Sequence, residues 1–411
     1  MTFLIFFKNN VRWLLGGFLL TLFSSFGQTF FISLSAGDIR AEFGLSRGDF
    51  GALYMVATLA SALTLPKLGR IVDHLSVPTT IAIVSPMLAL SAFSMSRAEH
   101  VAVLAVTIYA LRLFGQGMMT HIAMTAMGRW FSAQRGRAVS IATIGHQAGE
   151  AVFPFLFVSV VVVIGWRATW LLAAMVMAGV ALPAIWLLMR EERTPRSGDR
   201  AAEGARVRDW TRDEVLRDPL FYLALLGVLA PPFIGTTIFF HQVYLVELRG
   251  WSLEVFATSF AVMSTMTLVC ALLAGALVDR FSAVTLLPGF LVPLGLACFS
   301  LAAFEGQWSA FAFMALLGVS YGFSSILFGS VWPEIYGVRH LGAIRSVIMA
   351  TMVFATALGP GVTGQLIDMG VDYPLQIAGM GAYCLVASLI MRKVSRVAAR
   401  RRFSPPAVET A

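Results

Sequence analysis

Twelve long apolar segments alternate with short polar ones along this chain of 411 residues. Each has about the 17 to 25 residues that a helix needs to cross ~30 Å of hydrocarbon. The segments cover residues 13–35, 50–68, 78–96, 101–124, 138–164, 168–189, 219–245, 253–277, 283–303, 308–330, 343–367 and 374–391. The pattern predicts an all-α membrane protein with twelve transmembrane helices, six in each half of the chain.

A repeated loop divides these segments into two equal sets. Residues 69–76 read GRIVDHLS and residues 275–282 read GALVDRFS, and each loop joins two apolar segments. At the same offset, without a gap, several further positions coincide: Gly44 with Gly250, Ser46 with Ser252, Phe50 with Phe256 and Gly136 with Gly342. A repeat in the same direction is typical of transporters whose two similar halves meet around a site near the middle of the membrane.

The repeat and the polar stretches set the predicted domain boundaries. Residues 1–189 form an N-terminal six-helix half, 190–218 a cytoplasmic linker, 219–391 a C-terminal six-helix half and 392–411 a basic cytoplasmic tail. In the linker, Thr211 followed by Asp213 and Glu214 predicts a short helix at the membrane surface. The other loops are short, which leaves no room for a soluble catalytic or DNA-binding domain.

The distribution of charge predicts the orientation of the chain. Hydrophobic residues make up 58% of the positions and charged residues 13%, which excludes an ordinary soluble protein. With both termini in the cytoplasm, 24 of the 30 Lys and Arg residues lie on the cytoplasmic side, and Arg40, Arg47, Arg97, Arg167 and Arg249 lie outside. The positive-inside rule therefore predicts this orientation, and the chain is expected to be a multi-pass protein of the inner (plasma) membrane. Topology explains the net charge of +8, and no nucleic-acid partner is predicted.

No metal or cofactor site is predicted. Cys270, Cys298 and Cys384 lie far apart in separate apolar segments, which indicates neither a disulfide nor a zinc site. The sequence contains no phosphate loop, nucleotide fingerprint or metal-ligand cluster. The chain is not predicted to be an enzyme, because its few charged residues within spans do not make up a set of catalytic groups.

Two charged residues lie deep inside predicted spans. Arg112 follows Val101 by eleven residues and Glu150 follows Arg137 by thirteen, which places them about 16 Å and about 20 Å from the two membrane surfaces. Because an isolated charge in hydrocarbon costs several kcal/mol, the two are predicted to form an ion pair between adjacent helices. Either Glu150 accepts a proton when Arg112 moves away, which couples protons to transport, or the pair is a permanent structural contact.

Residues near this pair add further candidates. His146 precedes Glu150 by four residues, so both lie on one helical face and His146 is a candidate proton relay. Gly145 and Gly149 predict a close contact with a neighbouring helix. His241, at the outer end of the seventh span, is another titratable candidate.

The repeated loop resembles the signature G-x-x-x-D-R-x-G-[RK]-[RK] of the major facilitator superfamily. The first copy matches at Gly69 and Asp73 and the second at Gly275, Asp279 and Arg280, whereas His74, Ser76 and Ser282 depart from the pattern and the final basic pair is missing. Arg112 and Gly117 match the R-x-x-x-x-G pattern of the fourth span in that family. The resemblance implies that Gly69 lets spans 2 and 11 approach closely and that Asp73 forms a cytoplasmic latch. It also implies a cavity lined by spans 1, 4, 7 and 10, which makes Gln28 and Tyr321 candidates for substrate contacts.

Three strings, GQTFF at 27–31, RWFSAQRGRA at 129–138 and PEIYGVRHLGAIRS at 333–346, resemble the monocarboxylate and oxalate/formate branch of that superfamily. That branch typically has an arginine in span 8 for the carboxylate, but residues 253–277 contain no Arg or Lys, so Arg112 is the base available to an anion.

The predicted function is a monomeric secondary transporter for a small organic solute, with a monocarboxylate as one class. It works by alternating access, with protons as the predicted coupling ion and the lipid bilayer as its surroundings. An efflux carrier for amphipathic compounds is an alternative. A non-transporting receptor or scaffold is an alternative of another class, although a receptor usually carries an output domain.

Overall fold

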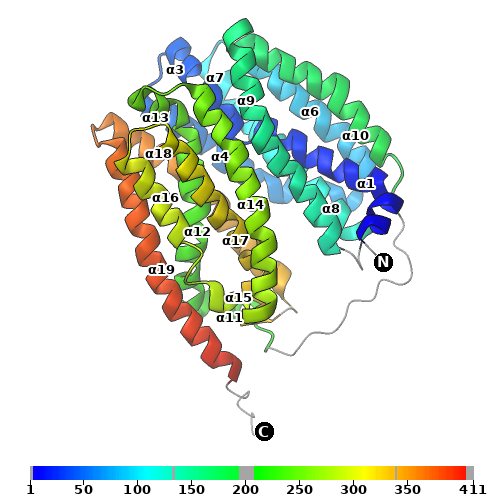
Figure 1. Ribbon diagram of the computed structural model, residues 1–411. Helices are drawn as coiled ribbons and strands as arrows, with labels where there is room; N and C mark the ends of the chain where they lie inside the picture. Colours follow the sequence, from blue (N-terminus) through cyan, green and yellow to red (C-terminus); the bar gives the residue numbers. More distant parts are fainter. Residues whose placement is uncertain (1–2, 132–134, 194–207, 338–339, 404–411) are drawn as a thin grey trace. The chain divides into compact units, whose positions relative to one another are not determined.

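The computed structural model describes residues 3–131, 135–193, 208–337 and 340–403, and every regular element in these ranges is helical (Figure 1). The α-helices are α1 (Phe3–Phe23), α2 (Thr29–Ile32), α3 (Ala36–Phe43), α4 (Arg47–Leu68), α5 (Ile71–His74), α6 (Val77–Arg97), α7 (Val101–Leu111), α8 (Thr120–Trp130), α9 (Arg135–Val176), α10 (Leu182–Met189), α11 (Arg212–Arg217), α12 (Pro219–Phe240), α13 (Gln242–Arg249), α14 (Leu253–Phe281), α15 (Ala283–Leu286), α16 (Val292–Ala303), α17 (Trp308–Tyr336), α18 (Leu341–Asp368) and α19 (Tyr373–Phe403). Short 3₁₀ segments are η1 (Ser24–Gly27) and η2 (Ser33–Ser35), and π-helical segments are η3 (Arg112–Met119) and η5 (Met177–Ala181).

The predicted all-helical membrane fold is confirmed, whereas the count of twelve spans stays a prediction. In the described residues, nine helical segments are long and apolar enough to cross a membrane, or ten if the bent pair Phe6–Gly27 and Thr29–Phe43 counts as one span. The segment Arg137–Met189 counts once at 53 residues. It is interrupted at Gly165 (φ 77°, ψ 163°), between two of the predicted spans. Helix α16 has 12 residues, which is too short for a helix to cross a membrane by itself.

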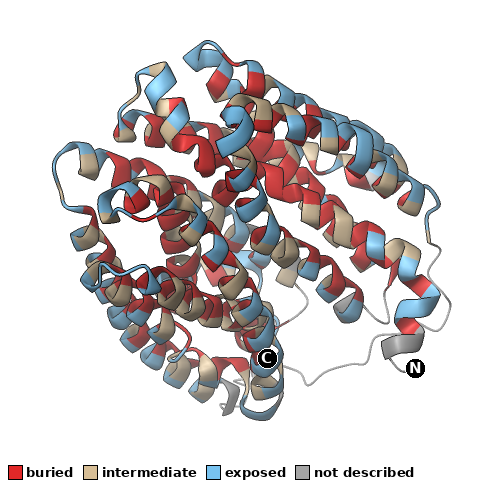
Figure 2. Cartoon of the chain, turned by 45° about the horizontal axis from the view of Figure 1, so that its top comes forward, coloured by how far each residue is buried: buried red, intermediate tan, exposed pale blue. Residues whose placement is uncertain are grey.

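Large apolar side chains cover the outside of the helices. Leu63, Val163 and Leu272 are 77%, 80% and 72% exposed. Buried residues instead lie on the sides where neighbouring helices face one another (Figure 2). Because exposure of so many apolar side chains to water is unfavourable, this surface is suited to contact with lipid.

The chain divides into two compact units. Unit 1 comprises Met1–Ala202, Phe239–Ala261 and Pro360–Asp368, and unit 2 comprises Glu203–Ile238, Val262–Gly359 and Met369–Ala411. Unit 1 therefore includes the N-terminal half, helix α13 and the last part of α18. The predicted domain boundaries at 189, 218 and 391 follow the sequence repeat and stay predictions.

Local geometry supports the duplication. Gly44 (φ 63°) and Gly250 (φ 62°) end helices α3 and α13 in the left-handed conformation, which glycine adopts without strain. Two residues later, Ser46 caps α4 by accepting from the Asp49 N–H at 2.9 Å, and the Ser252 hydroxyl accepts from the Val255 N–H at 3.3 Å. In both copies the aligned glycine ends a helix, and the aligned serine hydroxyl accepts a hydrogen bond from the first turn of the next helix.

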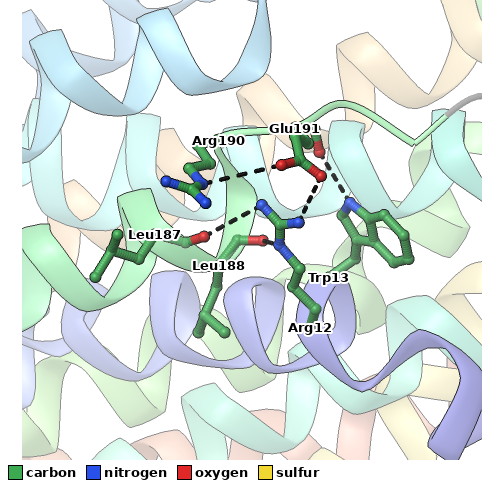
Figure 3. Close-up of polar contacts among 6 residues, drawn as sticks. All are labelled: Arg12, Trp13, Leu187, Leu188, Arg190 and Glu191. Carbon is green, nitrogen blue, oxygen red and sulfur yellow. Dashed lines mark hydrogen bonds and ion pairs between the residues drawn. The ribbon is translucent and has the colours of Figure 1, made fainter.

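In unit 1, Arg12 joins the start of the chain to the end of α10. Its guanidinium donates to the Leu188 carbonyl at 2.8 Å and the Leu187 carbonyl at 3.3 Å, and it pairs with Glu191 at 2.6 Å (Figure 3). Trp13 Nε1 donates to the Glu191 carbonyl at 2.9 Å. These donors satisfy carbonyls that the last turn of a helix leaves without an intrahelical partner.

In unit 2, the buried carboxylate of Asp218 ties the linker to two distant helices. Arg401 donates to it at 2.6 and 3.0 Å, the Tyr336 hydroxyl at 2.9 Å and the Leu220 N–H at 3.1 Å. Burial alone would raise the pKa of Asp218, but these hydrogen bonds outweigh burial and hold the pKa below its usual value. The linker helix is confirmed as α11, where Thr211 and Glu214 form a reciprocal capping box.

Candidate functional site

The first predicted span is broken near its middle. Residue Gln28 is extended (φ −86°, ψ 152°) between η1 and α2, and the helical segments on either side meet at 46°. Gly27 lies so close to the fourth span that an added Cβ would be 2.7 Å from the Gly115 Cα, and it would also overlap the Leu111 carbonyl. A broken span leaves backbone groups in the apolar region that must bond to protein or to a ligand.

Arg112 occupies this break. It is 1% exposed and begins the π-helical turn η3, a rare geometry that is frequent at functional sites. Its Nη1 donates to the Gly27 carbonyl at 3.3 Å and the Thr29 hydroxyl at 3.1 Å, and its Cζ lies 5.5 Å from the ring centre of Tyr54. Its Nε and Nη2 atoms are buried and have no hydrogen-bond partner in the described residues. The guanidinium is thus held in place but only partly satisfied.

The predicted ion pair between Arg112 and Glu150 is wrong. The described contacts of Arg112 are with Gly27, Thr29 and Tyr54, none of which is an acid. Glu150, 6% exposed, instead lies with its Oε1 3.5 Å from Nε2 of His146 on the same helix. The prediction used depth alone, and the break in the first span, which supplies neutral acceptors to Arg112, had no clear signal in the sequence.

The local predictions around Glu150 are confirmed. The spacing of four residues brings His146 and Glu150 together on α9. An added Cβ at Gly145 would overlap the Phe18 carbonyl, and one at Gly149 would overlap the Ser25 hydroxyl. Helix α9 therefore packs tightly against α1 and η1 through these two glycines.

The remaining predicted contact residues have different surroundings. Gln28 is in the break beside Thr29, in unit 1. His241 is buried between α12 and α13, where its Nε2 lies 3.2 Å from the Pro360 carbonyl. Tyr321 is in unit 2, where its hydroxyl donates to the Pro231 carbonyl at 3.3 Å and packs on Gly235.

The repeated loop is described only in part. The side chains of Asp73 and Asp279 lie outside the described residues, so the predicted latch stays a prediction. Arg280 is exposed, with its Cζ 5.1 Å from the ring centre of Phe281, and an added Cβ at Gly275 would have open space around it. An added Cβ at Gly69 would lie 2.8 Å from the Leu65 carbonyl and 3.3 Å from His121.

Spans 2 and 11 do approach closely in unit 1, but at another glycine. A Cβ at Gly51 would lie 2.5 Å from the Pro360 carbonyl, and one at Gly361 would lie 2.9 Å from the Met55 sulfur. Gly359, Pro360 and Gly361 are consecutive in the sequence, and nothing near them identifies α4 as the neighbour.

Two glutamates that the sequence did not single out cap the helices after the repeated loop. In unit 1 the Val77 N–H donates to Glu192 at 2.7 Å, and in unit 2 the Ala283 and Val284 N–H groups donate to Glu334 at 3.0 and 3.2 Å. A carboxylate at a helix N-terminus stabilises it, because the N–H groups there lack partners. Their distance along the chain from the helices they cap hid both roles.

A helical chain with an apolar outer surface, a broken span and a buried arginine at that break has features typical of membrane transporters. The sequence model of the Major Facilitator Superfamily matches residues 17–360. The chain belongs to that superfamily, and the resemblance noted from its motifs is confirmed.

Similar proteins are transporters. The oxalate:formate antiporter of Oxalobacter formigenes is 23% identical over 336 residues, which cover 80% of this chain and 78% of that one. A solved bacterial homolog of the human lysosomal transporter Spinster, in an inward-facing and unoccupied conformation, has a TM-score of 0.74 at 17% identity, covering 96% of this chain and 99% of that one. A mutant form of the nucleoside transporter NupG has a TM-score of 0.67 at 15% identity, with 96% and 100% covered. At these identities the solved structures establish the fold alone.

Proposed function

We propose that this protein is a secondary transporter that moves a small organic anion, with a monocarboxylate as the first class to test, across the inner membrane by alternating access. One observation carries the choice of an anion: the guanidinium of Arg112 is buried at a broken span with two nitrogen atoms that lack a hydrogen-bond partner in the described residues. A planar guanidinium with free N–H groups matches a carboxylate in shape and charge.

Protons are the proposed coupling ion, and Glu150 with His146 is the proposed carrier of the proton. Glu150 is a buried carboxyl whose described ionisable neighbour is a histidine at 3.5 Å. A carboxyl and an imidazole in contact can exchange a proton, and their charges change together when one is taken up. This replaces the predicted role of Arg112 as the partner of Glu150. The anion and the proton then have separate sites in unit 1.

The relatives support the same class. The matched protein from Oxalobacter formigenes is named an oxalate:formate antiporter, and we propose that this chain transports a related small carboxylate.

Amphipathic compounds are a second candidate substrate class, favoured by an apolar cavity in unit 1. It lies between Leu34, the outer part of α9 at Phe157 and Val161, and the start of α14 at Leu253, with a volume of about 480 Å³ between its lining atoms. Such a cavity suits an apolar group better than a small carboxylate.

The test is uptake by proteoliposomes containing the purified full-length protein, across formate, oxalate, lactate, a neutral metabolite and an amphipathic dye, with and without a pH gradient. We expect uptake of a carboxylate that Arg112→Ala abolishes, that Arg112→Lys restores in part, and that Arg97→Ala leaves unchanged. Arg97 is an exposed arginine and serves as the matched control. We expect Glu150→Gln to remove the response to the pH gradient. If the dye alone were taken up, the proposal that the substrate is a small organic anion would be refuted in favour of amphipathic compounds.

A further inference from the structure

A second cavity with positive charge lies in unit 1, apart from Arg112. The residues that line it include Arg40, Arg47, Phe50, Phe240, His241 and Tyr244. The void between the lining atoms is about 270 Å³, and part of it is open to the surroundings. Since the enclosed part is small, the space suits an ion of a few heavy atoms and not a large metabolite.

The wall of this cavity carries two cations and no carboxylate. Of the two acids nearby, Glu247 pairs with Arg47 of the cavity wall at 3.4 Å, and Asp368 accepts from the Gly48 N–H at 2.7 Å. The guanidinium of Arg40 makes no hydrogen bond or ion pair within 4.0 Å in the described residues, and Glu247 and Asp368 act on it only from farther away. Arg47 lies 3.9 Å over the ring of Tyr244, and its Nε is buried without a hydrogen-bond partner in the part of the chain described.

Aromatic rings separate this cavity from Arg112. The Phe50 ring stacks on the Phe240 ring at 5.2 Å, and Phe240 lies 4.7 Å from Tyr54. Tyr54 is the residue whose ring lies 5.5 Å from the Arg112 guanidinium. The two cationic places are therefore on opposite sides of one aromatic layer, and both are within unit 1.

We infer that this cavity is a binding site for a small monovalent anion of the size of chloride or formate. The charge of Arg40, which no carboxylate within 4.0 Å balances in the described residues, attracts an anion, and Arg47 adds a second donor group beside its pairing with Glu247. The orphaned Nε of Arg47 and the unpaired head of Arg40 supply the donors. The inference goes beyond the proposed function, because it concerns a second site whose anion need not be the one transported.

Occupation of this site also has a structural consequence. Arg40 is on α3 and Arg47 begins α4, whereas Phe240, His241 and Tyr244 come from the segment that includes α13. An anion held by both arginines would fix α3 to α4 beside α13. Binding should therefore stabilise unit 1 against unfolding, by an amount that grows with the ratio of anion concentration to Kd.

The experiment measures thermal unfolding and calorimetric binding with purified full-length protein in detergent. Sodium formate and sodium chloride are titrated at constant ionic strength against sodium gluconate, whose anion is too large for the cavity. All measurements use an Arg112→Met background, so that the central site cannot contribute. We expect formate or chloride to raise the unfolding temperature and gluconate not to do so.

Variants then locate the site. Arg40→Gln should weaken binding at least tenfold, Arg40→Lys should weaken it less, and Arg97→Gln should leave it unchanged. Because the Arg40 guanidinium makes no hydrogen bond in the described residues, and its backbone carbonyl keeps the Leu45 N–H as a partner in any variant, its substitution should not by itself prevent folding. Equal shifts with all three salts, or binding that survives Arg40→Gln, would overturn the inference. Failure of carboxylate uptake would refute the proposed function and leave this binding result standing.

Discussion

Replacing Arg112 with methionine should make the protein more stable while abolishing transport. The guanidinium is buried among neutral partners, and a charged arginine at the centre of a membrane helix costs about 2.5 to 3.5 kcal/mol on insertion scales. The contacts of a structural arginine should offset this cost in full, whereas those of a substrate-binding arginine offset only part of it until the ligand arrives. The sign of the stability change therefore separates the two roles.

The structure sets the magnitude. Arg112 gains two hydrogen bonds, at 3.1 and 3.3 Å, near the long end of the usual range. It also gains a cation–π contact with Tyr54 at 5.5 Å. Removal leaves the Gly27 carbonyl without this donor, at a cost of about 1 kcal/mol, but Thr29 keeps the Tyr54 hydroxyl as a partner at 2.7 Å. When these lost contacts are set against the insertion cost of about 2.5 to 3.5 kcal/mol, we expect a net gain of about 1 to 2 kcal/mol.

The assay is thermal and chemical unfolding of purified protein in one detergent, with Arg97→Met as the matched control. The free energy of unfolding of the control should stay within about 0.5 kcal/mol of that of the parent, because Arg97 is exposed. A fall of several degrees in the unfolding temperature of Arg112→Met, at a level that the control does not show, would refute the reasoning. Arg112 would then be a structural residue, and the anion site would have to be sought elsewhere.

Two further predictions concern packing and pH. Gly51→Leu should destabilise the protein by about 1 to 3 kcal/mol or more, because the new side chain would overlap the Pro360 carbonyl. Gly379→Leu is the matched control and should be close to neutral, because the space around its Cβ is open. The unfolding temperatures of the two variants are compared with that of the parent. Asp218→Asn should lower stability at pH 7, because the pKa of Asp218 is lower in the folded state than in the unfolded state and its contribution is therefore present above about pH 4. The difference between the parent and this variant should shrink as the pH falls below that value, and a difference independent of pH would contradict the assignment.

Short-range patterns in the sequence predicted structure well. The spacing of His146 and Glu150 and the capping residues at Thr211 both depend on residues within one or two helical turns. In each case local backbone geometry fixes the contact, so the sequence alone contains the information.

Contacts between segments far apart in the chain could not be predicted from the sequence. Asp218 accepts from Tyr336 and Arg401, which lie 118 and 183 positions away, and nothing near Asp218 indicates either partner. Depth in the membrane matched Arg112 with Glu150, but depth does not fix the direction in which a side chain points around its helix. The π-helical turn that begins at Arg112 rotates the residues after it relative to an α-helix, and the break at Gln28 supplies acceptors. Neither feature has a reliable sequence signal.

The separate partners of Arg112 and Glu150 still converge on one short segment. Gly149, next to Glu150, packs against Ser25, and two residues later the Gly27 carbonyl accepts from Arg112. In the proposed mechanism, a proton taken up by Glu150 alters the charge beside one end of η1, while an anion on Arg112 alters the hydrogen bonding at the other end. Coupling between two ligands requires an element whose equilibrium both of them bias. The break in the first span, held by glycine contacts on both sides, is the element that meets this requirement.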